Sequence, residues 1–298
     1  KSVLYSDRSN IVISSFLKKI GLFYVVLRVL GVYPDQKRLA ESRIAKIRYP
    51  LKYLAYKTNF DLVIATQDGS GTEIYLNKLL NPKTPRNILI NGVDVKINKK
   101  EFINGSVKIL FVGTLSPTKG IIEVLQSIKL LDRKIFDFEL NIVGKGPLLD
   151  YCNNFVTKNK LYGIVNVVGA LSKDELDAYY NMSNIYISAN KLGNLSNTVL
   201  EAAAHGLCLL LLDKDKNTNT DFFTVDYFKN NVIFIDRTNI VECIIDELTR
   251  LLSNNKLISK YSGRISEFAV NNFLSWNDRI KWELEQINYI TAASSKGK

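Results

Sequence analysis

The sequence predicts an α/β protein with two Rossmann-like domains. From Val107 onward, short apolar runs alternate with stretches of helical periodicity, and the runs predict strands at 107–113, 138–144, 165–169, 184–188, 207–212 and 232–235. Such alternation is typical of a parallel sheet covered by helices on both faces. A helix from about Asn197 and three helical segments before the C-terminus complete the pattern of one whole Rossmann-like domain.

The first part of the chain predicts a second, incomplete α/β domain. Helical residues 37–58 lead into a strand at 61–65, and a helix follows the glycine-rich turn 68–71. A strand at 87–90 and a weak one at 3–5 are too few for a closed doubly wound sheet. The chain opens at Lys1 and its one methionine is Met182, which also favours a missing front end.

The segment 91–106, rich in Asn, Gly and Lys, is the predicted linker between these domains. We therefore expect a partial N-terminal domain at 1–103, a complete domain at 104–275 and a C-terminal segment at 276–298.

The most apolar region is 11–33, and Lys18, Lys19 and Arg28 interrupt it before it reaches the length of a membrane span. We expect a buried or half-buried helix pair here. Because basic residues lie beside Phe16, an interfacial membrane anchor is the alternative.

Composition restricts the partners. A net charge of +11 and a pI near 9.3 suit an anionic partner, but the lysines are scattered and no nucleic-acid motif is present. We expect a phosphate-bearing ligand or an anionic membrane surface, and no nucleic acid. Cys152, Cys208 and Cys243 form no disulfide or zinc pattern, which favours a cytoplasmic protein. The region 11–33 adds the alternative that it is peripheral on the inner face of the membrane.

Four loops follow the predicted strands, where parallel α/β sheets bind their ligands. In the first, Lys119 lies at the mouth of a helix and can neutralise a phosphate. The glycines of the second bring backbone close to a bound group. In the third, Ser172 and Glu175 form a capping box.

The fourth loop carries the most information. Ser196 or Asn197 can cap a helix whose first amides form an anion site, and Glu201 lies about one turn inside that helix. A carboxylate beside a phosphate site is unusual unless it accepts hydroxyl hydrogen bonds, as a ribose would donate. The four loops together therefore predict a nucleotide site.

In order, the segments VGTLSPTKG, IVGKGP, VVGALSKDEL, YYNMSNIYISAN and NLSNTVLEAAAHG resemble the C-terminal domain of family-four glycosyltransferases of the GT-B fold. Upstream, DLVIATQDGS and INGVD are similar to the end of that family's N-terminal domain, so the resemblance runs from Asp61 to Trp276 and the last helix. It implies a GT-B fold in which the helix from Trp276 crosses back onto an N-terminal, acceptor-side domain.

The resemblance also implies roles for single residues. Lys119 would bind the donor diphosphate, and the backbone amides near Leu195 to Thr198 would bind its distal phosphate. Glu201 would bind the ribose. Lys119 and Glu201 are therefore the expected catalytic residues. With the strand-end loops, the expected donor-binding residues are Gly113, Thr114, Lys119, Gly144, Gly146, Gly169, Ala170, Leu171, Asn194, Leu195, Ser196, Asn197, Thr198 and Glu201.

Two positions depart from the family pattern. Thr114 replaces an arginine that contacts phosphate, and Gly193 replaces the first glutamate of the family's Glu, seven residues, Glu motif. The implied reaction is a retaining, metal-free transfer of a hexosyl group from a UDP-sugar or GDP-sugar to a saccharide or lipid-linked saccharide, in polysaccharide or glycolipid assembly. No cofactor is expected, and the catalytic base is not assigned.

Other patterns point to structural roles. The run 213–217 is similar to a calcium loop but lacks the glycine and glutamate that such loops need, so we expect a solvated loop without metal. His205, the one histidine, follows a helix end and is expected to act as a cap or dipole partner.

Three alternative functions stay open at this point. A nicotinamide-dependent oxidoreductase shares the fold class, but the first strand of the complete domain is not followed by G-x-G-x-x-G. A non-catalytic nucleotide-sugar-binding module would bind without turnover. A basic membrane-surface protein would use 11–33.

Overall fold

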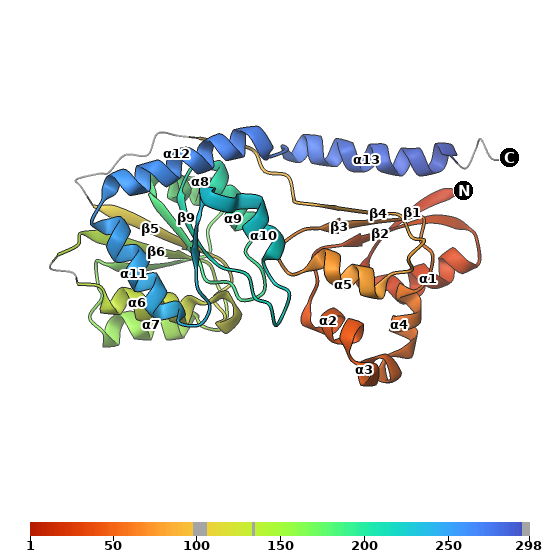
Figure 1. Ribbon diagram of the computed structural model, residues 1–298, viewed down its shortest axis with the longest axis horizontal. Helices are drawn as coiled ribbons and strands as arrows, with labels where there is room; N and C mark the ends of the chain where they lie inside the picture. The colour runs from red at the N-terminus through yellow and green to blue at the C-terminus, as the bar shows by residue number, and fades with distance from the viewer. Residues whose placement is uncertain (98–105, 133–134, 294–298) are drawn as a thin grey trace. The chain divides into compact units, whose positions relative to one another are not determined.

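The structure, a computed structural model, describes residues 1–97, 106–132 and 135–293. The chain forms two compact units: unit 1 comprises Lys1–Gly92 and Leu274–Lys298, and unit 2 comprises Val93–Phe273. Each unit has its own parallel sheet, which confirms the α/β prediction with two Rossmann-like domains (Figure 1). The predicted boundary between 103 and 104 lies outside the described residues.

Unit 2 contains a six-stranded parallel sheet with the order β10-β9-β8-β5-β6-β7. Its strands agree with the six predicted ones to within one residue at each end. The elements are β5 (Val107–Val112), η3 (Pro117–Lys119), α6 (Ile121–Leu130), β6 (Phe138–Val143), α7 (Leu149–Lys158), β7 (Val165–Gly169), α8 (Lys173–Met182), β8 (Ile185–Ser188), α9 (Asn197–Ala204), β9 (Cys208–Leu212), α10 (Phe222–Phe228), η4 (Lys229–Asn231), β10 (Ile233–Ile235), α11 (Ile240–Leu252) and α12 (Asn255–Asn272).

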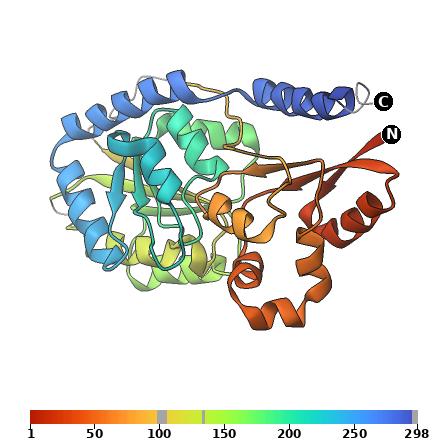
Figure 2. The ribbon, with the colours of Figure 1, turned by 45° about the vertical axis from the view of Figure 1, so that its right-hand side comes forward.

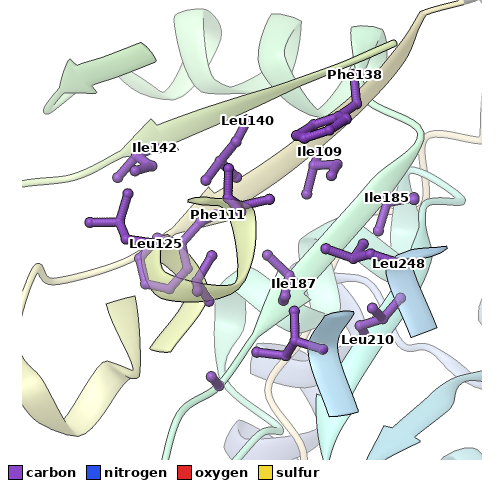
Figure 3. Packing of buried hydrophobic residues seen from close by; sticks show 14 of the residues in the cluster. Ile109, Phe111, Leu125, Phe138, Leu140, Ile142, Ile185, Ile187, Leu210 and Leu248 are labelled. Atoms are coloured by element: carbon purple, nitrogen blue, oxygen red, sulfur yellow. The ribbon is translucent and has the colours of Figure 1, made fainter. Parts of the chain in front are cut away.

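The strands β8 and β9 of unit 2 are buried on both faces along their whole length, which explains why their sequences are almost entirely apolar. Alternate residues point to one face, where Ile109 and Phe111 of β5 pack with Leu125 of α6 and Leu248 of α11 (Figure 3). Helices α6, α7 and α11 cover this face, while α8, α9 and α12 contact the other. Unit 2 is therefore a three-layer structure that exposes the ends of its strands.

Unit 1 has a four-stranded parallel sheet with the order β1-β2-β3-β4. Helix α13 packs on one face through Ile287 and Ile290, whereas α1, α2, α4 and α5 pack on the other (Figures 1 and 2). The elements are β1 (Ser2–Asp7), η1 (Arg8–Asn10), α1 (Ile11–Lys19), β2 (Phe23–Val29), α2 (Pro34–Glu41), α3 (Arg43–Arg48), α4 (Pro50–Tyr56), β3 (Leu62–Thr66), α5 (Thr72–Leu79), β4 (Arg86–Leu89) and α13 (Trp276–Ala293).

A polar cluster fixes α13 to the sheet of unit 1. The buried Arg279 donates from Nε to the carbonyl oxygen of Ile90 at 3.1 Å and pairs with Glu283 at 2.6 Å. The hydroxyl of Tyr5 donates to the same glutamate at 2.9 Å. The last helix thus completes unit 1 from the far end of the chain.

The expectation of a helix pair at 11–33 is wrong in its second half. Helix α1 ends near Gly21, whose φ of +74° favours glycine, and the chain then enters β2, an inner strand of the sheet. Because Val25, Val26 and Leu27 are all buried, β2 lacks the alternation that marks a half-exposed strand. Among the described residues, no helix has the length and apolar character needed to span a bilayer.

The helical residues predicted at 37–58 are confirmed, and they are divided among three short helices. Ser42 has an extended backbone and its hydroxyl accepts from the amide of Ala45 at 3.2 Å, which starts α3. Pro50 then starts α4, as proline favours the first turn of a helix.

Candidate functional site

The site lies where the order of strands in unit 2 reverses. From β5 the chain adds β6 and β7 on one side of the sheet, and then returns to add β8, β9 and β10 on the other. Strands β5 and β8 are therefore neighbours with connections that leave in opposite directions. Open parallel sheets bind ligands beyond the carboxyl ends of two such strands. The loops after β5 and β8 are thus the first candidates.

Lys119 ends the 3-10 turn η3 in the loop after β5. The next residue, Gly120, has a φ of +74°, and a Cβ there would lie 2.3 Å from the carbonyl oxygen of Ala189, in the loop after β8. The amide of Lys191 also donates to the carbonyl of Thr118 at 2.9 Å. The two loops are therefore in contact, and Lys119 lies at their junction.

Helix α9 begins at the end of the loop after β8. Ser196 is its N-cap, but the serine hydroxyl makes no capping bond and instead pairs with the hydroxyl of Thr198 at 3.1 Å. The hydroxyl of Tyr186 in β8 donates to that threonine at 3.0 Å. These hydroxyl contacts fix the start of α9, whose positive dipole end attracts anions.

Asn194 supports this loop from the inside. It is buried, and its side-chain amide donates to the carbonyl of Asn190 and to a carboxylate oxygen of Asp221, both at 2.8 Å. Its side-chain oxygen accepts from Ser188 at 2.7 Å. With its side-chain groups occupied by protein partners, this predicted binding residue shapes the loop rather than presenting its side chain to a ligand.

Asp221 is the centre of this buried network, and sequence reasoning missed it. Its carboxylate accepts from the Asn194 amide at 2.6 Å and the Thr224 hydroxyl at 2.8 Å, and it pairs with Arg237 at 2.5 Å. Burial raises the pKa of Asp221 to about 6, so the group is ionised at pH 7.5. Its φ of 62° is unusual for a residue other than glycine.

Glu201 occupies the second turn of α9, where it is half-buried. The Tyr180 hydroxyl donates to its Oε2 at 3.1 Å. Burial raises the pKa of Glu201, while this hydrogen bond and the charge of Lys173 lower it. Burial also raises the pKa of Tyr180 well above its usual value, so its hydroxyl stays protonated. Tyr180, also missed, orients the carboxylate.

The loops after β6 and β7 continue the same edge of the sheet. Gly144 donates from its amide to the carbonyl of Gly169 at 2.7 Å, and Gly113 donates to the carbonyl of Val143 at 3.0 Å. Gly146 lies against Leu115, where a Cβ would approach the carbonyl oxygen to 2.5 Å. Thr114 and Ala170 are exposed and Leu171 is partly buried. These predicted residues therefore form one backbone-lined rim.

Replacing Gly144 with alanine is expected to lower the free energy of unfolding by about 2 kcal/mol or more. A Cβ there would lie 1.9 Å from the carbonyl oxygen of Gly113, and a φ of 143° is strained for alanine. Urea denaturation followed by circular dichroism measures the change. Gly263→Ala is the control, because this helical glycine has open space around it and should gain about 0.5–1 kcal/mol. Equal stability of the two variants would contradict the predicted clash.

Two of the structural interpretations are confirmed. Ser172 and Glu175 form the capping box, with the Ser172 amide donating to the glutamate at 2.8 Å. His205 is the C-cap residue of α9, and its Nδ1 lies 2.8 Å from the carbonyl oxygen of Glu201.

The run 213–217 forms a polar turn. The carboxylate of Asp215 accepts from the amide of Asn217 at 2.9 Å and from the hydroxyl of Thr218 at 2.7 Å. Within the described ranges, no three His, Cys, Asp or Glu side chains are grouped as metal ligands.

Residues 93–269 match the family model of glycosyl transferases group 1. The chain belongs to this family. The match covers the described parts of the candidate site, including the strand-end loops and helix α9. The resemblance seen in the sequence is therefore confirmed at the level of the family.

Relatives and solved structures agree with the assignment to group 1. An uncharacterized glycosyltransferase of Haemophilus influenzae is 24% identical over 72% of this chain and 57% of its own length. One of Methanocaldococcus jannaschii is 28% identical over 68% of this chain and 56% of its own length. The chain thus spans little more than half the length of these curated relatives.

The HepE protein of Anabaena, solved in complex with UDP, superposes with a TM-score of 0.74 at 12% identity, over 96% of this group 1 chain and 79% of HepE. At this identity the superposition shows the fold alone, and it confirms the predicted GT-B fold.

Proposed function

We propose that this chain binds a nucleoside diphosphate sugar at the carboxyl edge of the six-stranded sheet and transfers its hexosyl group to a hydroxyl acceptor with retention of configuration. One observation carries the proposal: at the reversal point of the sheet, the loop that holds Lys119 contacts the loop that leads into α9, and Glu201 lies in the second turn of that helix. The lysine cation and the positive end of the helix dipole suit the diphosphate, and the carboxylate suits the ribose hydroxyls.

Each group has a distinct role in the proposed reaction. The bond between the anomeric carbon and the diphosphate breaks as the acceptor oxygen bonds to that carbon on the same face, and the hydroxyl proton of the acceptor passes to an oxygen of the departing diphosphate. Negative charge develops on the diphosphate, which Lys119 and the amides of α9 stabilise electrostatically without a metal. Glu201 accepts hydrogen bonds from the ribose hydroxyls. Gly113, Thr114, Gly144, Gly146, Gly169, Ala170 and Leu171 supply the rim around sugar and base.

The donor class is supported by proteins of the same fold. HepE was solved with UDP-glucose and a pneumococcal O-GlcNAc transferase with UDP and GlcNAc. We propose UDP-sugars as first candidates and GDP-sugars as second, with a saccharide or lipid-linked saccharide as acceptor in polysaccharide or glycolipid assembly.

Release of nucleoside diphosphate from a panel of UDP- and GDP-hexoses tests the proposal, with a mixture of short saccharides as acceptors. We expect release from one donor group, and magnetic resonance of the product should show the donor's anomeric configuration. Donor binding without release would favour the alternative of a binding module, for which Gly193 at the position of the family glutamate is the specific observation.

The affinity for UDP is expected to depend on pH through Glu201. The carboxylate accepts the ribose hydrogen bonds only when ionised, and burial raises its pKa above the usual 4.5. The wild type should therefore bind UDP more tightly than Glu201→Gln by the largest factor at high pH, and this difference in affinity should disappear as pH falls through the raised pKa of Glu201. The measured quantity is the ratio of the wild-type affinity to the Glu201→Gln affinity at each pH, because titration of the UDP phosphate affects both proteins equally.

Tyr180→Phe serves as the companion variant. Removing the hydroxyl removes a hydrogen bond that lowers the pKa of Glu201, so the loss of affinity should begin at a higher pH, with a weakening of about 1 kcal/mol at pH 8. A ratio that does not change with pH would contradict the assigned role of Glu201.

A further inference from the structure

Helices α3 and α4 of unit 1 expose four aliphatic side chains. Ile44 and Ile47 are 77% and 79% exposed, and Leu51 and Leu54 are 69% and 56% exposed. Residues three apart in a helix lie on the same face, so each helix presents one apolar pair to solvent. Single exposed aliphatic residues are common, but four within eleven residues mark an interaction surface.

Strong positive charge accompanies these side chains. Between positions 37 and 57 the sequence has one acidic residue, Glu41, and it pairs with Lys78 at 3.0 Å. The same stretch has seven basic residues: Lys37, Arg38, Arg43, Lys46, Arg48, Lys52 and Lys57. We call Ile44, Ile47, Leu51 and Leu54 with Arg43, Lys46 and Arg48 the α3–α4 surface; Lys52 is left out because it pairs with Asp35 at 2.7 Å.

The inner sides of the same helices are well packed. Ala45 of α3 and Ala55 and Tyr56 of α4 are buried in the core of unit 1. Both views show α3 on the side of unit 1 farthest from α13, beyond the helices that cover the sheet (Figures 1 and 2). The α3–α4 surface is therefore the outer face of anchored helices.

We propose that the α3–α4 surface docks this protein on an anionic lipid bilayer. Aliphatic side chains enter the boundary between headgroups and acyl chains, while lysine and arginine pair with anionic headgroups. A nucleic acid would use the charges but leave the isoleucines and leucines in water. The proposal moves the membrane contact from 11–33, where β2 is a sheet strand, to α3 and α4, and it is independent of the proposed donor site.

Sedimentation with vesicles tests this assignment. The full chain is mixed with vesicles of phosphatidylcholine alone or with 30% phosphatidylglycerol, and the partition coefficient is measured at low and high salt. We expect binding to the anionic vesicles, weakening with salt. Ile44→Ser with Ile47→Ser should lower the partition coefficient at least tenfold, since each side chain contributes a large transfer free energy. Arg43→Gln with Arg48→Gln should lower it by a similar factor.

Matched controls come from exposed residues of unit 2. Leu130→Ser with Val270→Ser removes two aliphatic groups that are also largely exposed, and Lys129→Gln with Lys158→Gln removes two exposed charges. Both controls should keep wild-type partitioning, and circular dichroism should show all variants folded. Equal partitioning into neutral vesicles, no partitioning, or equal losses in controls and α3–α4 variants would each overturn the proposal. So would light scattering that shows self-association through this surface in place of vesicle binding.

Discussion

Replacing Asp221 with alanine is expected to lower the free energy of unfolding of unit 2 by about 3–5 kcal/mol, the usual cost of breaking a buried ion pair by removing one partner. The substitution would leave Arg237 without its carboxylate, the backbone amide of Asn194 without its acceptor, and the side-chain amide of Asn194 with only the carbonyl of Asn190. Each buried donor left unsatisfied adds to the cost.

The two units require separate probes. Both tryptophans, Trp276 and Trp282, lie in α13, so their fluorescence follows unit 1. Hydrogen exchange of the amides in β9 follows unit 2. The exposed Asp226 supplies the control, because Asp226→Ala on α10 should change stability by less than about 0.5 kcal/mol. If the β9 amides are protected from exchange as strongly in Asp221→Ala as in Asp226→Ala, the buried network around Asp221 does not stabilise unit 2.

The same substitution should also affect the candidate site, because Asp221 accepts hydrogen bonds from Asn194 in the loop that leads into α9. We expect weaker UDP binding by Asp221→Ala even at temperatures where it is folded. Asp221→Asn, which keeps shape but removes charge, should fall between alanine and the wild type in both stability and affinity.

Replacing Lys119 with alanine is expected to slow hexosyl transfer by about 100- to 1,000-fold, the range seen when one preorganised charge-stabilising group is removed. The lysine lies where the loop after β5 contacts the loop after β8, which leads into α9. Because charge grows on the diphosphate during the reaction, the larger effect should be on kcat rather than on KM.

Two companion variants sharpen the test on Lys119. Lys119→Arg keeps the positive charge and should recover part of the rate, whereas Lys256→Ala removes an exposed lysine of α12 and should leave the rate unchanged. A wild-type kcat in Lys119→Ala would contradict the proposed role.

Much of unit 2 could be predicted because its strands are short, largely apolar runs, and glycine ends or follows three of them, β5, β6 and β7. The run at 107–113 became β5, and that at 138–144 became β6. Capping at Ser172 was also readable, since a capping box involves residues only three positions apart. Local patterns of this kind are recorded in the sequence itself.

Contacts between distant residues could not be read in the same way. Tyr180 lies 21 positions before Glu201, and Asp221 lies 27 positions after Asn194, so neither partner is marked by spacing. Strand β2 was missed because a fully buried strand and a buried helix have similar apolar content, and here Phe23–Val29 follows directly on a real helix.

Calorimetric titration of the wild-type protein with UDP and with GDP tests the donor site most directly, beside Glu201→Ala and the exposed control Glu267→Ala. The predicted result is that one nucleotide binds the wild type and the control equally, and that Glu201→Ala loses at least about tenfold in affinity, as expected when hydrogen bonds to a charged group are removed. Absence of binding to either nucleotide by folded protein, or equal affinity in Glu201→Ala, would contradict the proposed site.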